Sequence, residues 1–200
     1  GLSAWTPQRW EAFNRIAAAS DFVIEQSVRD PVMLLELVRS GELDRSLAPG
    51  EMCAQIGAAV QAAETEEELG RVLRRQRTRQ QVRIIWRDLT RQADLVQTCR
   101  DLSDMADTCI DQAYQWLYQR LSQQFGVPTG RRSGEPQQMV ILGMGKLGAV
   151  ELNLSSDIDL IFAYPEGGET VGVKRPLHNQ EFFIRVVQRT WKDDNIVQID

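Results

Sequence analysis

The sequence has little histidine and cysteine. Its 200 residues contain one histidine, His178, and three cysteines, none of them in a Cys-x-x-Cys pair. A disulfide framework or a Cys/His zinc site is therefore not expected, which fits a reducing, cytoplasmic location. A single histidine also argues against hydrolases built on Ser/His/Asp or Cys/His groups. We expect any chemistry to be done by carboxylates.

The chain also lacks an excess of positive charge and a long apolar run. Its formal net charge is −5, whereas sequence-independent binding of nucleic acid needs a surplus of lysine and arginine. No window approaches the roughly 20 apolar residues that a bilayer-spanning helix needs. The hydrophobic fraction of 42% and the charged fraction of 26% are ordinary for a globular protein. We therefore expect neither a nucleic acid nor a membrane as a partner.

Helical patterns fill residues 1–125. Thr6 and Asp30 each precede a proline, which is typical of a helix start, and Thr65–Glu68 has the form of a capping box. Long amphipathic runs follow over residues 66–91 and 101–125. The first of these runs is rich in arginine, which indicates a solvated face or, alternatively, a docking surface for an acidic partner.

The composition changes at Gly126. Residues 126–138 are rich in glycine, proline and arginine, which predicts a linker or an exposed loop. After them come a buried strand, "MVIL", a short helix over 147–152, a strand "DIDLIFAY", a polar loop and a final helix. We predict an α+β fold with a helical domain at 1–125, a linker at 126–138 and a second, sheet-containing domain at 139–200. The last residues resemble the beginning of a strand, so we interpret the chain as a fragment.

Two carboxylates stand out in this second domain. Asp157 and Asp159 occupy positions i and i+2 of the expected strand, so they point to one face, opposite Ile158 and Leu160. An isolated Asp-x-Asp is more often a solvated edge or a helix cap. Half-buried together, however, two carboxylates repel each other unless a cation lies between them. Carboxylates that hold Mg²⁺ against phosphate oxygens are the usual means of phosphoryl or nucleotidyl transfer.

A glycine-rich turn, "GMGKLG" at residues 143–148, precedes the carboxylates. Glycine lets backbone amides approach an anion closely. Within the turn, Lys146 is either an exposed lysine or a point charge that binds a phosphate. Ser155 and Ser156 add hydroxyls beside the carboxylates. The turn does not satisfy the Walker pattern, which needs Ser or Thr directly after Gly-Lys, and it does not complete a dinucleotide-binding fingerprint.

These stretches resemble a known family. "MVILGMGKLGAVELNLSSDIDLIFAYPEGG" is similar to the nucleotidyltransferase motif of the bifunctional glutamine synthetase adenylyltransferase/adenylyl-removing enzymes. "RQRTRQQVRIIWRDLTRQADLVQTCRDLSDMADTCI" resembles the helical region that precedes this motif. The family carries two such units, and "ELNLSSDIDLIFAYPEGG" is more similar to the N-terminal, adenylyl-removing one. The resemblance implies that residues 139–200 are part of a nucleotidyltransferase catalytic domain.

The resemblance also implies a reaction and its residues. The adenylyl-removing unit removes AMP from a tyrosine of glutamine synthetase by phosphorolysis, releases ADP and so regulates nitrogen assimilation. Mg²⁺ would be the cofactor; glutamine synthetase, a PII-type signal protein, phosphate, ADP and ATP would be the partners. The family motif assigns catalysis to Asp157, Asp159 and Lys146. It assigns phosphate or nucleotide binding to Gly143, Gly145, Lys146, Gly148, Ser155 and Ser156, and metal binding to Asp157, Asp159 and, as a third carboxylate, Asp200.

Two alternatives remain open at this point. The same site could run in the adenylylating direction, with transfer of AMP from ATP. The segment could instead be a docking module for glutamine synthetase or a PII-type protein, without activity of its own. The sequence departs from the family at Ala149, where a glycine is usual, and again after "FFIRVVQR". We therefore expect the isolated 200-residue chain to show little or no turnover.

Overall fold

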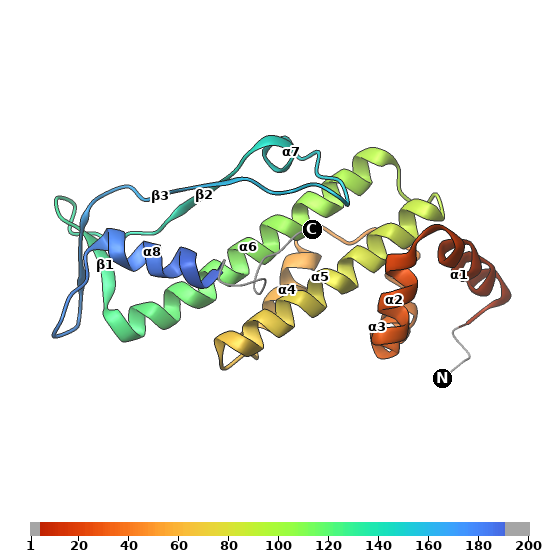
Figure 1. The fold of residues 1–200 in the computed structure, drawn as a ribbon, viewed down its shortest axis with the longest axis horizontal. Helices are drawn as coiled ribbons and strands as arrows, with labels where there is room; N and C mark the ends of the chain where they lie inside the picture. Colours follow the sequence, from red (N-terminus) through yellow and green to blue (C-terminus); the bar gives the residue numbers. More distant parts are fainter. Residues whose placement is uncertain (1–4, 191–200) are drawn as a thin grey trace.

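The computed structural model describes residues 5–190 of the chain (Figure 1). Its helices are α1 Pro7–Ala19, α2 Asp21–Arg29, α3 Pro31–Ser40, α4 Glu51–Gln61, α5 Glu66–Leu89, α6 Leu95–Phe125, α7 Gly145–Gly148 and α8 Asn179–Thr190. Its strands are β1 Val127–Gly130, β2 Val140–Gly143, β3 Leu160–Ala163 and β4 Gly168–Val171. The expected α+β fold is confirmed.

Two long helices, α5 and α6, form the centre of the molecule (Figure 1). Helices α1–α3 lie at one end of this pair, and α8 lies beside α6 toward the other end. The caps that the sequence predicts are present: the side chains of Thr6, Asp30 and Thr65 each accept a hydrogen bond from a backbone N–H three residues on. Each cap satisfies one donor that the first turn leaves unpaired.

The apolar side chains form two clusters that meet on α5. Leu69 and Leu73 of α5 belong to a large cluster with α4, α6, α8 and the strand-bearing segment. Val82 and Trp86 belong to a second cluster with α1–α3. Every residue from Gln80 to Arg87 is buried, although the sequence indicated a helix with one apolar side. Helices pack on both sides of this half of α5, so its polar face is buried as well.

The strands form two separate antiparallel pairs. β2 pairs with β3, with Leu142 opposite Ile161, and β1 pairs with β4. The second pair lies where the sequence predicted no strand: β1 is within residues 126–138, expected to be a linker or an exposed loop, and β4 is within the expected polar loop. Thr170 of β4 is only 2% exposed, so tertiary pairing orders a segment whose composition is typical of a loop.

Side chains of α6 hold the strand-bearing segment in place. The Tyr118 hydroxyl donates to the Gln137 carbonyl (3.0 Å), and the Met139 N–H donates to the Tyr114 hydroxyl oxygen (2.8 Å). The β2–β3 hairpin therefore lies along α6 (Figure 1). The large apolar cluster includes residues on both sides of the expected linker. The division into domains at 1–125 and 139–200 stays a prediction.

Candidate functional site

The glycine turn connects β2 to α7, and packing explains two of its glycines. A Cβ atom at Gly148 would lie 2.4 Å from the Gly143 carbonyl oxygen. One at Gly143 would lie 2.9 Å from Cγ of Leu147, which is buried. A side chain at either position would force the turn open. These two glycines are therefore required by the turn itself, whatever it binds.

Gly145 is the glycine that leaves the backbone open. Its φ is +53°, which L side chains rarely adopt, and a Cβ there would meet nothing within 4 Å. The expected close approach of an anion to the backbone therefore fits Gly145 best. Helix α7 is shorter than expected: it ends at Gly148 rather than continuing to Leu152. Val150 adopts a φ of +59°, which is incompatible with a continuing helix.

Asp157 and Asp159 are not strand residues. β3 begins at Leu160, and both carboxylates are exposed in the loop before it, not half-buried on a strand. The expected alternation still holds, because Ile158 and Leu160 pack against the apolar cluster while the two aspartates face solvent. Water therefore reduces the repulsion that the sequence suggested.

A backbone hydrogen bond joins the carboxylate loop to the glycine turn. The Met144 N–H donates to the Asp159 carbonyl oxygen (2.9 Å), one step beyond the pairing of Gly143 with Leu160. This bond extends the β2–β3 ladder to the beginning of the turn. The bond therefore places Asp159 beside Met144, the residue that precedes Gly145, at one end of the β2–β3 hairpin.

A small polar network lies beside the carboxylates. The Lys146 ammonium donates to the Ser156 hydroxyl (3.2 Å), and that hydroxyl donates to the Asn153 side-chain oxygen (2.5 Å). Ser156 is 5% exposed and its hydroxyl is engaged in the loop, whereas Ser155 is exposed. Asn153 is absent from our sequence-based set of site residues. Its position in Asn-x-Ser-Ser, typical of a side-chain-stabilised turn, is a signal that could have indicated it.

The donor atoms suit a hard cation. Carboxylate oxygens are the ligands that Mg²⁺ prefers, and it commonly binds through one or two of them with water and substrate phosphates. Asp157 and Asp159 fit that requirement. Within residues 5–190, no group of three or more acidic, histidine or cysteine side chains is arranged to hold a metal. Asp200, the expected third carboxylate, lies outside the described residues.

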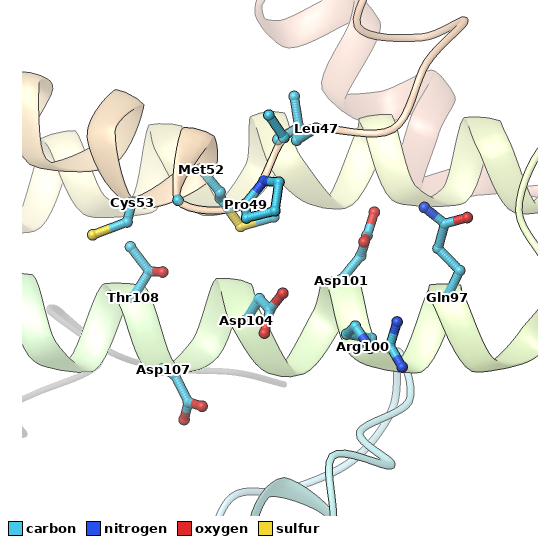
Figure 2. Close-up of a pocket in the computed structure, with 12 residues that line it drawn as sticks. Leu47, Pro49, Met52, Cys53, Gln97, Arg100, Asp101, Asp104, Asp107 and Thr108 are labelled. Atoms are coloured by element: carbon cyan, nitrogen blue, oxygen red, sulfur yellow. The ribbon is translucent and has the colours of Figure 1, made fainter.

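Several cavities adjoin α6; one lies away from the glycine turn and another borders it. Figure 2 shows the first, of about 500 Å³, between the beginning of α4 and α6; Pro49 and Met52 line one side and Asp101 and Asp104 the other. None of the predicted site residues lines it. The second, of about 540 Å³, lies between α6 and the β2–α7 segment. Gly143 and Gly148 are among its lining residues.

A glycine turn, a lysine and two carboxylates at one end of a hairpin make a site suited to chemistry on phosphate groups. Residues 10–193 match the glutamate-ammonia ligase adenylyltransferase family. The chain therefore belongs to that family.

Curated relatives agree with the family. The chain is 71% identical over 199 residues to the bifunctional glutamine synthetase adenylyltransferase/adenylyl-removing enzyme of Pseudomonas syringae pv. tomato. It is 64% identical over 199 residues to that of Pseudomonas aeruginosa, and 51% identical over 179 residues, 90% of this chain, to that of Thioalkalivibrio sulfidiphilus. The chain spans about a fifth of the length of these relatives. The resemblance inferred from the sequence is confirmed.

Among the helices within residues 5–190, α5 and α6 are the longest, with 24 and 31 residues. None of them combines the length and the apolar character that crossing a bilayer requires.

Proposed function

We propose that this segment contributes to a nucleotidyl-transfer site that removes AMP from adenylylated glutamine synthetase by phosphorolysis. One observation carries the proposal: the bond from the Met144 N–H to the Asp159 carbonyl places the carboxylate loop against the glycine turn. The site then has acceptors for a cation and donors for a phosphate side by side. Because the chain spans a fifth of its relatives, the proposal concerns the longer protein that contains it.

The reaction balances as an in-line displacement. An oxygen of inorganic phosphate forms a bond to the phosphorus of the AMP group, and the bond from that phosphorus to the tyrosine oxygen breaks. The tyrosine oxygen leaves with the electron pair and takes up a proton, and the product is ADP. Catalysis in this scheme comes from positioning and charge neutralisation, without a covalent intermediate on the enzyme.

Each residue of the site has a role in this scheme. Asp157 and Asp159 would hold Mg²⁺, which supplies positive charge to the phosphate oxygens when it is bound. Lys146 adds a second positive charge at the turn, and Ser156 and Asn153 orient its ammonium group. The Gly145 backbone is open to an anion. Ser155, exposed beside the carboxylates, is available to bind a phosphate or a ribose hydroxyl.

The direction of the reaction is proposed from the sequence. "ELNLSSDIDLIFAYPEGG" is more similar to the adenylyl-removing unit of the family than to the adenylylating one. A PII-type signal protein and a cytoplasmic location belong to the same proposal. The products distinguish the two directions, because phosphorolysis releases ADP and adenylylation from ATP releases pyrophosphate.

Charge removal at the carboxylates tests the proposal. In the longer protein, we expect Asp157→Asn or Asp159→Asn to reduce ADP release from adenylylated glutamine synthetase at least about a hundredfold at saturating Mg²⁺. The assay measures ADP and pyrophosphate separately, and circular dichroism checks that the variants fold.

Glu151→Gln is the matched control. Glu151 is exposed six residues before Asp157, so its replacement removes one negative charge from the same loop without touching the proposed ligands. Its activity should stay within about twofold of the parent. If either aspartate variant kept more than about a tenth of the parental rate, the catalytic assignment would be wrong.

A further inference from the structure

The cavity of about 540 Å³ between α6 and the β2–α7 segment shares a wall with the proposed phosphate site. Gly143 and Gly148 line it, and Gly145 lies in the same turn. The volume falls within the roughly 300–1,000 Å³ typical of small-molecule sites. A ligand in this cavity would therefore lie directly beside a phosphate bound at the turn.

The walls of this cavity combine polar groups with a set of buried apolar side chains. Its most buried lining side chains are apolar or aromatic and less than 9% exposed: Ile110 and Tyr114 from α6, Met139 before β2, and Leu147 from α7. The Tyr114 hydroxyl is occupied by the Met139 N–H, and burial raises its pKa to about 12. Its ring therefore serves as a neutral, apolar surface. Such walls suit a flat, uncharged ring.

Most of the polar groups of the cavity come from α6, and its two carboxylates are acceptors. Asp107 and Asp111 lie one turn apart on α6, with Gln115 and Gln138 nearby in the lining. Asp107 also lines the cavity of Figure 2, but there its carboxylate points away from Pro49 and Met52 on the opposite wall. Burial, followed by repulsion from Asp104, raises the pKa of Asp107.

The charge of the lining decides which end of a ligand can enter. No lysine or arginine is among the lining residues given for this cavity, so a phosphate has nothing there to offset its charge and two carboxylates to repel it. A neutral ring that carries a hydrogen-bond donor is favoured instead, because carboxylates are strong acceptors. The exocyclic amine of adenine is such a donor.

We propose that this cavity binds the adenine base of the nucleotide, with Asp111 and Asp107 as acceptors for its 6-amino group. The base lies between Tyr114 and Leu147, and the ribose leads toward the turn at Gly143–Gly145. This inference rests on the proposed function, because it places the phosphate of the same nucleotide at that turn. It adds a base-selecting subsite that sits on α6 rather than on the hairpin.

Two nucleosides test the proposal on the 200-residue chain. Adenosine carries the 6-amino group, and purine riboside differs from it only by lacking that group. We expect saturable binding of adenosine in an NMR titration, with shifts at Met139 and Gly143, and binding of purine riboside at least about tenfold weaker. Adenosine that does not bind at about 10 mM, or that binds no better than purine riboside, would overturn the proposal.

Two pairs of variants locate the site. Asp111→Asn should reduce the preference for adenosine at least about fivefold, whereas Asp104→Asn should not reduce it, because Asp104 lines only the other cavity and its replacement merely relieves the repulsion on Asp107. Leu142→Trp should abolish binding by filling the cavity. Ile161→Trp is its control. Leu142 and Ile161 are each 48% exposed and lie opposite each other on β2 and β3, but Ile161 is not among the residues that line the cavity.

The outcomes separate this proposal from the proposed function. Equal effects of the paired variants would refute the base-binding cavity. If at the same time Asp157→Asn abolished ADP release by the longer protein, the nucleotidyl-transfer proposal would stand and only the base subsite would fall. Binding of adenosine with the expected pattern, but full activity of Asp157→Asn, would leave the cavity as a nucleoside site and reject the catalytic role of the loop.

Discussion

Gly148 illustrates how closely the backbone packs at the proposed site. Its Cα faces the Gly143 carbonyl across the turn, at a distance where a Cβ would be 2.4 Å from the oxygen. Its neighbour, Leu147, points inward and joins the large apolar cluster. The turn therefore has no room for one additional methyl group at Gly148, and it cannot shift without moving the core side chain of Leu147.

We expect Gly148→Ala to destabilise the 200-residue chain by about 1–3 kcal/mol, because the new methyl group overlaps backbone rather than a flexible side chain. Urea denaturation followed by circular dichroism measures this. Gly167→Ala is the control: a Cβ there meets nothing within 4 Å, so the free energy of unfolding should change by less than about 0.5 kcal/mol. A Gly148→Ala protein as stable as the control would show that the turn is not tightly packed.

At the scale of elements, α5 and α6 are joined by buried charge. The Arg83 guanidinium, with a side chain 0% exposed, donates to the Asp101 carboxylate (2.7 Å). Arg87, 3% exposed, lies 3.8 Å from the same carboxylate. Burial and the neighbouring Arg83 lower the pKa of Arg87. One carboxylate of α6 thus compensates two buried cations of α5, so its loss would leave both without an anionic partner.

We expect Asp101→Asn to destabilise the chain by about 3–5 kcal/mol, the usual cost when one partner of a buried ion pair is removed. Denaturation at pH 7 measures the change. A loss below about 1 kcal/mol would mean that the two guanidinium groups are solvated or rearranged in solution.

Asp104→Asn is the control, one turn further along α6. Burial, followed by repulsion from Asp101, raises the pKa of Asp104. A raised folded-state pKa means that the ionised carboxylate costs stability at neutral pH, and that this cost disappears below the unfolded-state pKa of about 3.9. Asp104→Asn should therefore be as stable as the parent or more stable at pH 7, and any gain should vanish as the pH falls toward 3.5.

At the scale of the whole molecule, α6 is the support on which the proposed site is assembled. Three side chains of α6 form hydrogen bonds with the strand-bearing segment. From the C-terminal end of the helix toward its N-terminal end, the pairs are Tyr118 with Gln137, Tyr114 with Met139, and Ser103 with Leu152. The segment therefore runs antiparallel to α6, and the glycine turn lies between two of these attachment points. The position of the turn depends on the helix as much as on the hairpin.

We expect Tyr114→Phe to destabilise the chain by about 1–3 kcal/mol, because it leaves the N–H of Met139, a residue 8% exposed, without its acceptor. Hydrogen exchange at the Met139 and Val140 amides should also become faster. Tyr164→Phe is the control: its ring stacks on Phe183, and the substitution keeps that contact. If both variants lost the same stability, the bond to Met139 would have no special role in holding the hairpin.

Local signals in the sequence determined where several helices begin, where the glycine turn lies and which side chains near it face solvent. Thr6, Asp30 and Thr65 mark helix starts because a side-chain oxygen reaches a backbone N–H only three residues away. The turn at 143–148 and the alternation of Ile158 with Asp157 and Asp159 were likewise predicted, since glycine content and a two-residue period are properties of neighbouring residues. The family membership follows from the same stretches.

Tertiary structure decided what depends on distant partners. The arginines of α5 have the composition of a solvated face, but Arg83 and Arg87 are buried because α6 presents Asp101 to them. β1 and β4 are strands only because each is the other's partner across about forty residues of chain. The cavity beside the turn also exists only where α6 meets β2 and α7, since each supplies one wall and no single stretch of sequence contains them all.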